Sequence, residues 1–296
     1  MKGSEMQTGS VLIFDIKGNF GFFKTAEVTR ATLSFPFTPT SIIGIIAAIL
    51  GEKRNFYWAD NHPLANAKIA IQLINKPQKN TFQHSPLTVN YVHTKYPITI
   101  GGSSRTIKTY LSDAKKRGFV TDVRLDLIRN IHYRIFYKKP EKKEYLTIYS
   151  ELKKYLQKNW AYYPPYLGHA NLLAEIDYIG EFSLEKLKEK KAKISTVIPC
   201  SIIAEEIKDF LNRKVSVYID IPISMNVKNN KVLNVETENF IVPQEKNEKI
   251  EILIKPEHNI YAVAIKKDVL NDNVNIVFIP LLKKGKEETI RRIINN

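Results

Sequence analysis

The sequence has almost no cysteine and no apolar run long enough to cross a membrane. A single cysteine, Cys200, among 296 residues excludes an internal disulfide and a multi-cysteine zinc site, and is typical of a reducing compartment. The most apolar segment, Pro39 to Leu50, would rise only about 18 Å as a helix, whereas a bilayer core is roughly 30 Å thick. We therefore expect a cytoplasmic protein without a membrane segment.

Acidic residues are missing from a long part of the chain. No Asp or Glu occurs between Asp60 and Asp113, although that interval contains six Lys and Arg residues and three more follow at 115–117. The whole chain has a formal charge of +15, and residues 1–180 carry 25 basic and 13 acidic side chains. An ordinary solvated face usually carries both signs, so this one-sided charge favours a polyanion as partner over a plain lysine-rich surface.

Motifs for nucleotide hydrolysis and metal catalysis are also absent. The sequence has no P-loop, no dinucleotide fingerprint, no H-E-x-x-H and no carboxylate cluster, so we expect no cofactor and no metal. A metal-free ribonuclease needs only a general base, a general acid and a cation. The candidate catalytic residues are His132 with Tyr133, or His169 beside Tyr162 and Tyr163. The plainer alternative is that His132 packs on a strand and that His169 satisfies backbone groups in a turn.

The patterns that are present predict an α+β fold. Thr38 can cap a buried helix that begins at Pro39 and ends at Gly51. Between residues 77 and 118 the chain has turn residues and no sustained period, which predicts a long irregular excursion. The predicted order is strand 10–18, helix 39–50, strand 68–75, two strands within 123–139 broken near Arg129 and Asn130, helix 142–160 and strand 170–180. This order is the split βαβ of ferredoxin-like and RNA-recognition folds.

The remaining chain, residues 181–296, is predicted to be a smaller, appended β-rich module. Its elements are expected to be a charged helical stretch at 183–191, a helix at 201–211, strands near 214–221, 249–254, 260–265 and 275–279, and a short peripheral helix in 283–296.

Three segments together resemble one known family. They are "IFDIKGNFGFFKTAEVTRATLSFPFTPTSIIGIIAAILG", "LDLIRNIHYRIFY" and "YPPYLGHANLLAEIDYIG". In this order and at this spacing they resemble the CRISPR-associated protein 5 family, which belongs to the RAMP superfamily of type I CRISPR systems, with subtype I-B as the suggested assignment. The resemblance covers roughly residues 11–180.

The resemblance implies a fold and a role in antiviral defence. It implies a ferredoxin-like RAMP domain over residues 1–180, with a protruding basic thumb at about 77–118 that grips the 5′ handle of the guide RNA in the Cascade surveillance complex. The implied partners are the guide RNA, the backbone RAMP subunit, the large subunit and, through the complex, target DNA. An acid-free thumb suits this role, since a phosphate backbone requires cations without interspersed carboxylates.

Six cations are the predicted RNA-binding residues, with Arg105 foremost because it follows the flexible donors of "GGSS". They are Lys17, Lys24, Arg30, Lys95, Arg105 and Lys108. The segment "KGNFGFFK" around two of them has two interpretations. It is either the base-stacking signature of RNA-recognition motifs or a Gly-bent loop whose Phe residues pack inward.

Two other functions remain open at this stage. One is a metal-independent endoribonuclease that processes CRISPR repeat RNA. The other is a generic basic RNA-binding protein of ribosome or tRNA metabolism.

Overall fold

The computed structural model describes residues 9–23, 38–59, 61–75, 84–92, 120–205, 215–228, 231–243, 249–267, 270–279 and 281. For 84–92, 120–126, 267 and 270–271 it describes the backbone alone. None of the described helices is long and apolar enough to cross a membrane. The predicted helix in 283–296 lies outside the described residues.

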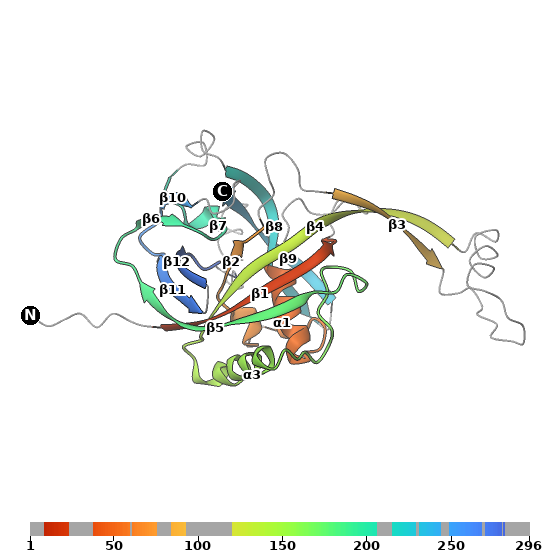
Figure 1. Ribbon diagram of the computed structural model, residues 1–296, viewed down its shortest axis with the longest axis horizontal. Coiled ribbons are helices and arrows are strands. Elements are labelled where there is room, and N and C mark those ends of the chain that lie inside the picture. Colours follow the sequence, from red (N-terminus) through yellow and green to blue (C-terminus); the bar gives the residue numbers. More distant parts are fainter. Residues whose placement is uncertain are drawn as a thin grey trace, which may run out of the picture.

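A seven-stranded antiparallel sheet forms the centre of the molecule (Figure 1). The strand order is β12-β11-β5-β1-β4-β2, and β3 pairs with β4 beyond this path. The strands are β1 (Gly9–Gly21), β2 (Ile69–Leu73), β3 (His84–Val92), β4 (Val120–Lys138), β5 (Glu175–Lys186), β11 (Tyr261–Lys267) and β12 (Leu270–Ile276).

The helix α1 (Pro39–Leu50) forms as the sequence predicts, because capping residues fix both its first and its last turn. The Thr38 hydroxyl accepts a hydrogen bond from Ser41 N at 3.1 Å, and Pro39 occupies the first turn. Gly51 ends the helix in the left-handed conformation, at φ 80°, which glycine adopts without steric cost. The prediction of a buried, capped helix is confirmed.

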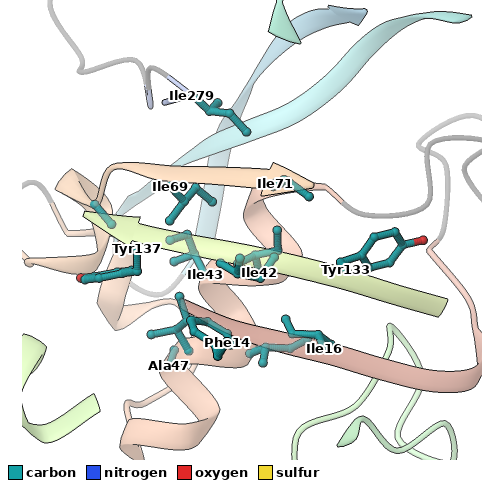
Figure 2. Packing of buried hydrophobic residues seen from close by; sticks show 14 of the residues in the cluster. Phe14, Ile16, Ile42, Ile43, Ala47, Ile69, Ile71, Tyr133, Tyr137 and Ile279 are labelled. Carbon is teal, nitrogen blue, oxygen red and sulfur yellow. The ribbon is translucent and has the colours of Figure 1, made fainter. Parts of the chain in front are cut away.

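One face of the sheet packs on α1 and on α3 (Leu146–Gln157), which the 3₁₀ turn η3 (Lys143–Tyr145) precedes. Phe14 and Ile16 of β1 and Tyr133 and Tyr137 of β4 belong to this core together with helix residues such as Ile43 (Figure 2). Alternate residues of the same strands, such as Val11 and Phe136, form a second cluster with β11 and β12. The odd-numbered residues of β4 from 131 to 137 thus lie on the side of the sheet that faces the helices.

The strand β4 is 19 residues long and pairs with three strands, with β1 along one edge and with β3 and β2 along the other. Its residues 120–128 pair with β3, while residues 133–137 pair with β2. Asn130 lies between these parts at φ 54°, where sequence analysis expected a break between two strands. The paired β3 and β4 project from the body as a two-stranded arm (Figure 1). The prediction of an irregular excursion is therefore wrong for 84–92, which pairs regularly with β4 along its whole length.

The C-terminal part is rich in strands, as predicted, but one helix prediction fails there. Residues 183–191 are strand up to Lys186, because Leu184 pairs with Gly9 and Lys186 pairs with Tyr261. The further strands are β6 (Lys191–Ile194), β7 (Ile198–Pro199), β8 (Val215–Lys228), β9 (Lys231–Pro243) and β10 (Ile250–Leu253). Two small sheets result, ordered β7-β9-β8 and β10-β6.

Short 3₁₀ turns complete the described structure. They are η1 (Phe56–Trp58), η2 (Leu64–Asn66) and η4 (Cys200–Ile202). The last of these begins the stretch where sequence analysis expected a helix from 201 to 211; residues 203–205 are not helical, and 206–211 lie outside the described residues.

Candidate nucleic-acid interface

Two of the quoted sequence segments interlock where β1 ends. Phe22 N donates a hydrogen bond to Leu167 O at 2.9 Å. Gly168 has φ 82°, and a Cβ there would lie 1.7 Å from the carbonyl oxygen of Phe22. Leu167 is fully buried, and its side chain lies so close to Gly18 that a Cβ on Gly18 would come within 2.3 Å of it. The glycine of "YPPYLGH" is thus required by the close approach of a backbone carbonyl, whereas Gly18 of "KGNFGFFK" lies against the end of the Leu167 side chain.

The third segment joins the same place through β4. Phe20 pairs with Arg129, and Lys17 pairs with His132 across the two strands. Leu172 packs against Phe22 and Leu127. We define the β1 junction as residues 17–23, 127–132 and 166–173, which lie at the root of the β3–β4 arm.

The three phenylalanines after Lys17 have different surroundings. Phe22 and Phe23 are buried, at 8% and 4% exposure, whereas Phe20 is 37% exposed. The guanidinium of Arg129 lies 6.0 Å from the centre of the Phe20 ring. Arg129 is exposed, and no described side chain forms an ion pair with it. Phe22 and Phe23 pack inward as the loop interpretation expects, but residues 17–21 continue strand β1 and do not form a loop. Phe20 and Arg129 leave one aromatic and cationic pair facing solvent.

A buried ionic network supports the junction from the body of the sheet. Arg134 Nε donates to Asp15 Oδ1 at 2.8 Å, and Arg134 Nη2 donates to Oδ2 at 3.0 Å. His132 Nε2 lies 2.9 Å from Asp15 Oδ2 and donates to it, since a carboxylate only accepts. Burial alone would raise the pKa of Asp15, but the hydrogen bonds and charges of His132 and Arg134 hold it below its ordinary value.

Lys17, one of the predicted RNA-binding residues, is tied to the neighbouring strand. Its ammonium group donates a hydrogen bond to Asp177 of β5 and forms an ion pair with it. This hydrogen bond raises the pKa of Lys17. The side chain remains 36% exposed, so its charge faces solvent but is already balanced by a carboxylate.

The other predicted RNA-binding cations, Lys24, Arg30, Lys95, Arg105 and Lys108, lie outside the described residues. In the chain, Lys24 and Arg30 come after β1, whereas Lys95, Arg105 and Lys108 come between β3 and β4. The cation that sequence reasoning missed is Arg129, where we expected only a strand break. The cross-strand partner of Arg129 is 109 positions away in the chain, so no local pattern could have paired it with Phe20.

The candidate catalytic residues do not converge on one centre within the described structure. His132 lies on the polar face of β4, whereas Tyr133 is 2% exposed on the opposite face, in the core with α1. Burial raises the pKa of Tyr133 well above its ordinary value. His169 is half-buried in the loop, where its Nδ1 accepts a hydrogen bond from Asn171 N at 3.4 Å. No group of three or more His, Cys, Asp or Glu residues that could hold a metal ion occurs among the described residues.

No family model matches the chain, and no curated protein matches it in sequence. Solved structures do share part of its outline. A chain described as a CRISPR RNA-guided surveillance complex is 12% identical, with 81% of this chain and 91% of that chain covered and a TM-score of 0.43. A CRISPR protein from Archaeoglobus fulgidus is 11% identical, with 90% and 99% covered and a TM-score of 0.45.

A functionally uncharacterized protein from Streptococcus mutans is 9% identical, with 85% of this chain and 95% of that chain covered and a TM-score of 0.36. At these identities and TM-scores the likenesses carry no argument about function. The functional conclusion rests on the residues themselves.

Proposed function

We propose that the chain is an RNA-binding structural subunit of a type I CRISPR Cascade complex, in which it grips the 5′ handle of the guide RNA. In that role it would anchor the backbone RAMP subunit and the large subunit, and it would meet target DNA only through the complex. The observation that carries the proposal is the convergence of the three family-like segments at the β1 junction, from which the β3–β4 arm projects.

The sheet supports the ferredoxin-like part of the proposal. In chain order, α1 lies between β1 and β2, and α3 lies between β4 and β5. In space the four strands are ordered β5-β1-β4-β2. This order, with both helices packed on the same core cluster, is the one expected of a split βαβ and so supports the proposed ferredoxin-like domain. The arm would be the thumb, inserted between β2 and β4.

Charge and chemistry support RNA as the ligand. The acid-free interval from 61 to 112 spans the chain that leads into and out of β3, and two lysines and an arginine follow it at 115–117. A flexible single strand needs cations for its phosphates and exposed rings for its bases. At the root of the arm, Arg129 and Phe20 offer one of each.

The endoribonuclease alternative has less support from the described geometry. A general acid and a general base must reach one substrate together, whereas the His132 ring is tied to Asp15 and the Tyr133 hydroxyl lies in the core. Incubation with repeat RNA in excess chelator tests the alternative directly. Specific cleavage under these conditions would favour it over a purely structural role.

The proposal is tested by comparing two RNAs of equal length. Purified protein, alone and with its backbone partner, is titrated into a fluorescently labelled repeat-derived 5′ handle and into a scrambled RNA, with anisotropy as readout at two salt concentrations. We expect tighter binding to the handle and a salt-dependent affinity for both RNAs. Equal affinity for the two RNAs, with and without the partner, would refute handle recognition.

A further inference from the structure

Three exposed aromatic side chains form a cluster on the loop that follows α3. Trp160, Tyr162 and Tyr163 are 47%, 59% and 49% exposed. The rings of Trp160 and Tyr162 are 6.1 Å apart at 86°, and those of Tyr162 and Tyr163 are 4.9 Å apart at 72°. We call these three residues the aromatic ridge. Contiguous exposed rings of this kind mark an interaction surface, because single exposed apolar residues are common but clusters are not.

The ridge is held firmly by the end of α1. Tyr162 N and Tyr163 N donate hydrogen bonds of 3.0 Å to the carbonyl oxygens of Ile49 and Ala48. These bonds use carbonyl groups that the last turn of a helix leaves without intrahelical partners. The Tyr162 ring also fills the space beside Gly51, where a Cβ would lie 2.6 Å from its Cγ. The rings are therefore positioned before any partner arrives.

The perpendicular packing covers less of the ring faces than parallel stacking would. In an edge-to-face pair, the ring that contributes its edge keeps both faces free of that neighbour. Trp160 also packs at 4.6 Å and 63° against Tyr155 of α3, and about half of each ridge side chain remains exposed. An open face on a fixed ring is the surface on which an unpaired base stacks.

The charges that flank the ridge favour a nucleic acid over an apolar protein surface. Lys158 precedes Trp160 by two positions, and Lys53 and Arg54 follow the Gly51 that contacts Tyr162; all three cations are exposed. The acidic residue of this stretch, Glu52, lies 3.4 Å from the imidazole of His62. Exposed rings close in sequence to exposed cations match a strand that alternates bases and phosphates.

We infer that the aromatic ridge stacks unpaired bases of single-stranded RNA, as a set of contacts additional to those of the β1 junction. This inference rests on the proposed RNA-binding function. The sequence predicts Trp160 at the end of the helix 142–160 and places Tyr162 and Tyr163 in the turn beside His169, and the RNA-binding function proposed above does not use these rings.

The two tryptophans of the chain provide the experiment. Trp58 is 3% exposed and Trp160 is 47% exposed, and the sequence has no other tryptophan. Titration of the full-length protein with an oligouridine long enough to reach the ridge should quench the fluorescence of Trp160 and leave the fluorescence of Trp58 unchanged. In a Trp160→Phe variant the quench should vanish while the affinity, measured by anisotropy, is retained, because phenylalanine also stacks.

Truncation of the rings gives the second arm of the experiment. Trp160→Ala and Tyr163→Ala should each weaken oligouridine binding by roughly 5- to 100-fold, the range for the loss of one base–aromatic stack. Ile219→Ala removes a more exposed apolar side chain, 68% exposed on β8, and should leave the affinity unchanged. Emission from Trp58 in each variant reports whether the fold is intact.

The outcomes separate this inference from the proposed function. Handle binding that survives in Trp160→Ala and Tyr163→Ala, with no quench in the wild type, would overturn the ridge inference alone. Loss of all RNA binding by the wild-type protein would overturn both. If the truncated variants bind RNA normally but no longer associate with the backbone or large subunit, the ridge is a protein-docking surface and the inference is wrong.

Discussion

Replacing Gly168 by Ala tests whether the β1 junction is a tightly fitted unit. The residue has φ 82°, and its new methyl group would lie 1.7 Å from the carbonyl oxygen of Phe22. The left-handed conformation costs an L-residue about 1–2 kcal/mol, and losing the adjacent bond from Phe22 N to Leu167 O costs about 0.5–1.5 kcal/mol. We expect the unfolding free energy to fall by about 1.5–3.5 kcal/mol in a denaturant titration.

Two other glycines serve as controls for this substitution. Gly51 also has φ 80°, and a Cβ there would lie 2.6 Å from Tyr162 Cγ, so Gly51→Ala should lower the unfolding free energy by at least the cost of the left-handed conformation, about 1–2 kcal/mol. Gly44 lies within α1 with its nearest contact, the Tyr57 hydroxyl, at 3.4 Å. Gly44→Ala should leave stability unchanged or raise it by up to about 1 kcal/mol through helix propensity. A Gly168→Ala variant as stable as Gly44→Ala would refute the interlocking described for the junction.

Three further predictions concern charge. Asp15→Asn leaves the buried guanidinium of Arg134 without its carboxylate partner and should lower the unfolding free energy by about 3–5 kcal/mol at pH 7. The pKa of Asp15 is lowered in the folded protein, so the stability that its carboxylate contributes is complete above the unfolded pKa of about 3.9 and is lost as the pH falls through the folded pKa. Only the wild type should lose this contribution of Asp15 in acid. Arg129→Gln should weaken handle binding in anisotropy titrations, and the exposed control Lys143→Gln should not. If both variants lose the same affinity for the handle, the cause is the lower net charge and not a contact made by Arg129. Changing both Arg105 and Lys108 to Ala should lower the slope of log affinity against log salt by about 1.4, at roughly 0.7 per phosphate, and an unchanged slope would show that neither contacts phosphate.

Local signals account for the parts of the fold that the sequence predicted. The α1 boundaries follow from Thr38, Pro39 and Gly51, whose effects act within one helical turn. The two-sided alternation of β4 likewise follows from neighbouring residues. Such signals need no knowledge of which strand lies beside which.

Strand pairing accounts for what the sequence could not predict. The charged stretch at 183–191 has a helical composition, but its backbone pairs with β1 and β11, and tertiary pairing outweighs propensity. The ion pair between Lys17 and Asp177 depends on the register of β1 and β5 across 160 positions. At the candidate site, the sequence indicated the basic character and the glycine motifs. The contact between Arg129 and Phe20 and the clustering of the aromatic ridge could be recognised only in the folded structure.

Photochemical cross-linking tests the central claim most directly. A 5′ handle RNA carrying a photoreactive uridine at one position at a time is bound to the protein and its backbone partner, irradiated and digested, and the linked peptides are identified by mass spectrometry. The account predicts links from handle positions to the β1 junction and to the arm, which a scrambled RNA of equal length gives only weakly. Links confined to β8 and β9, or the same peptides at the same yield from both RNAs, would contradict it.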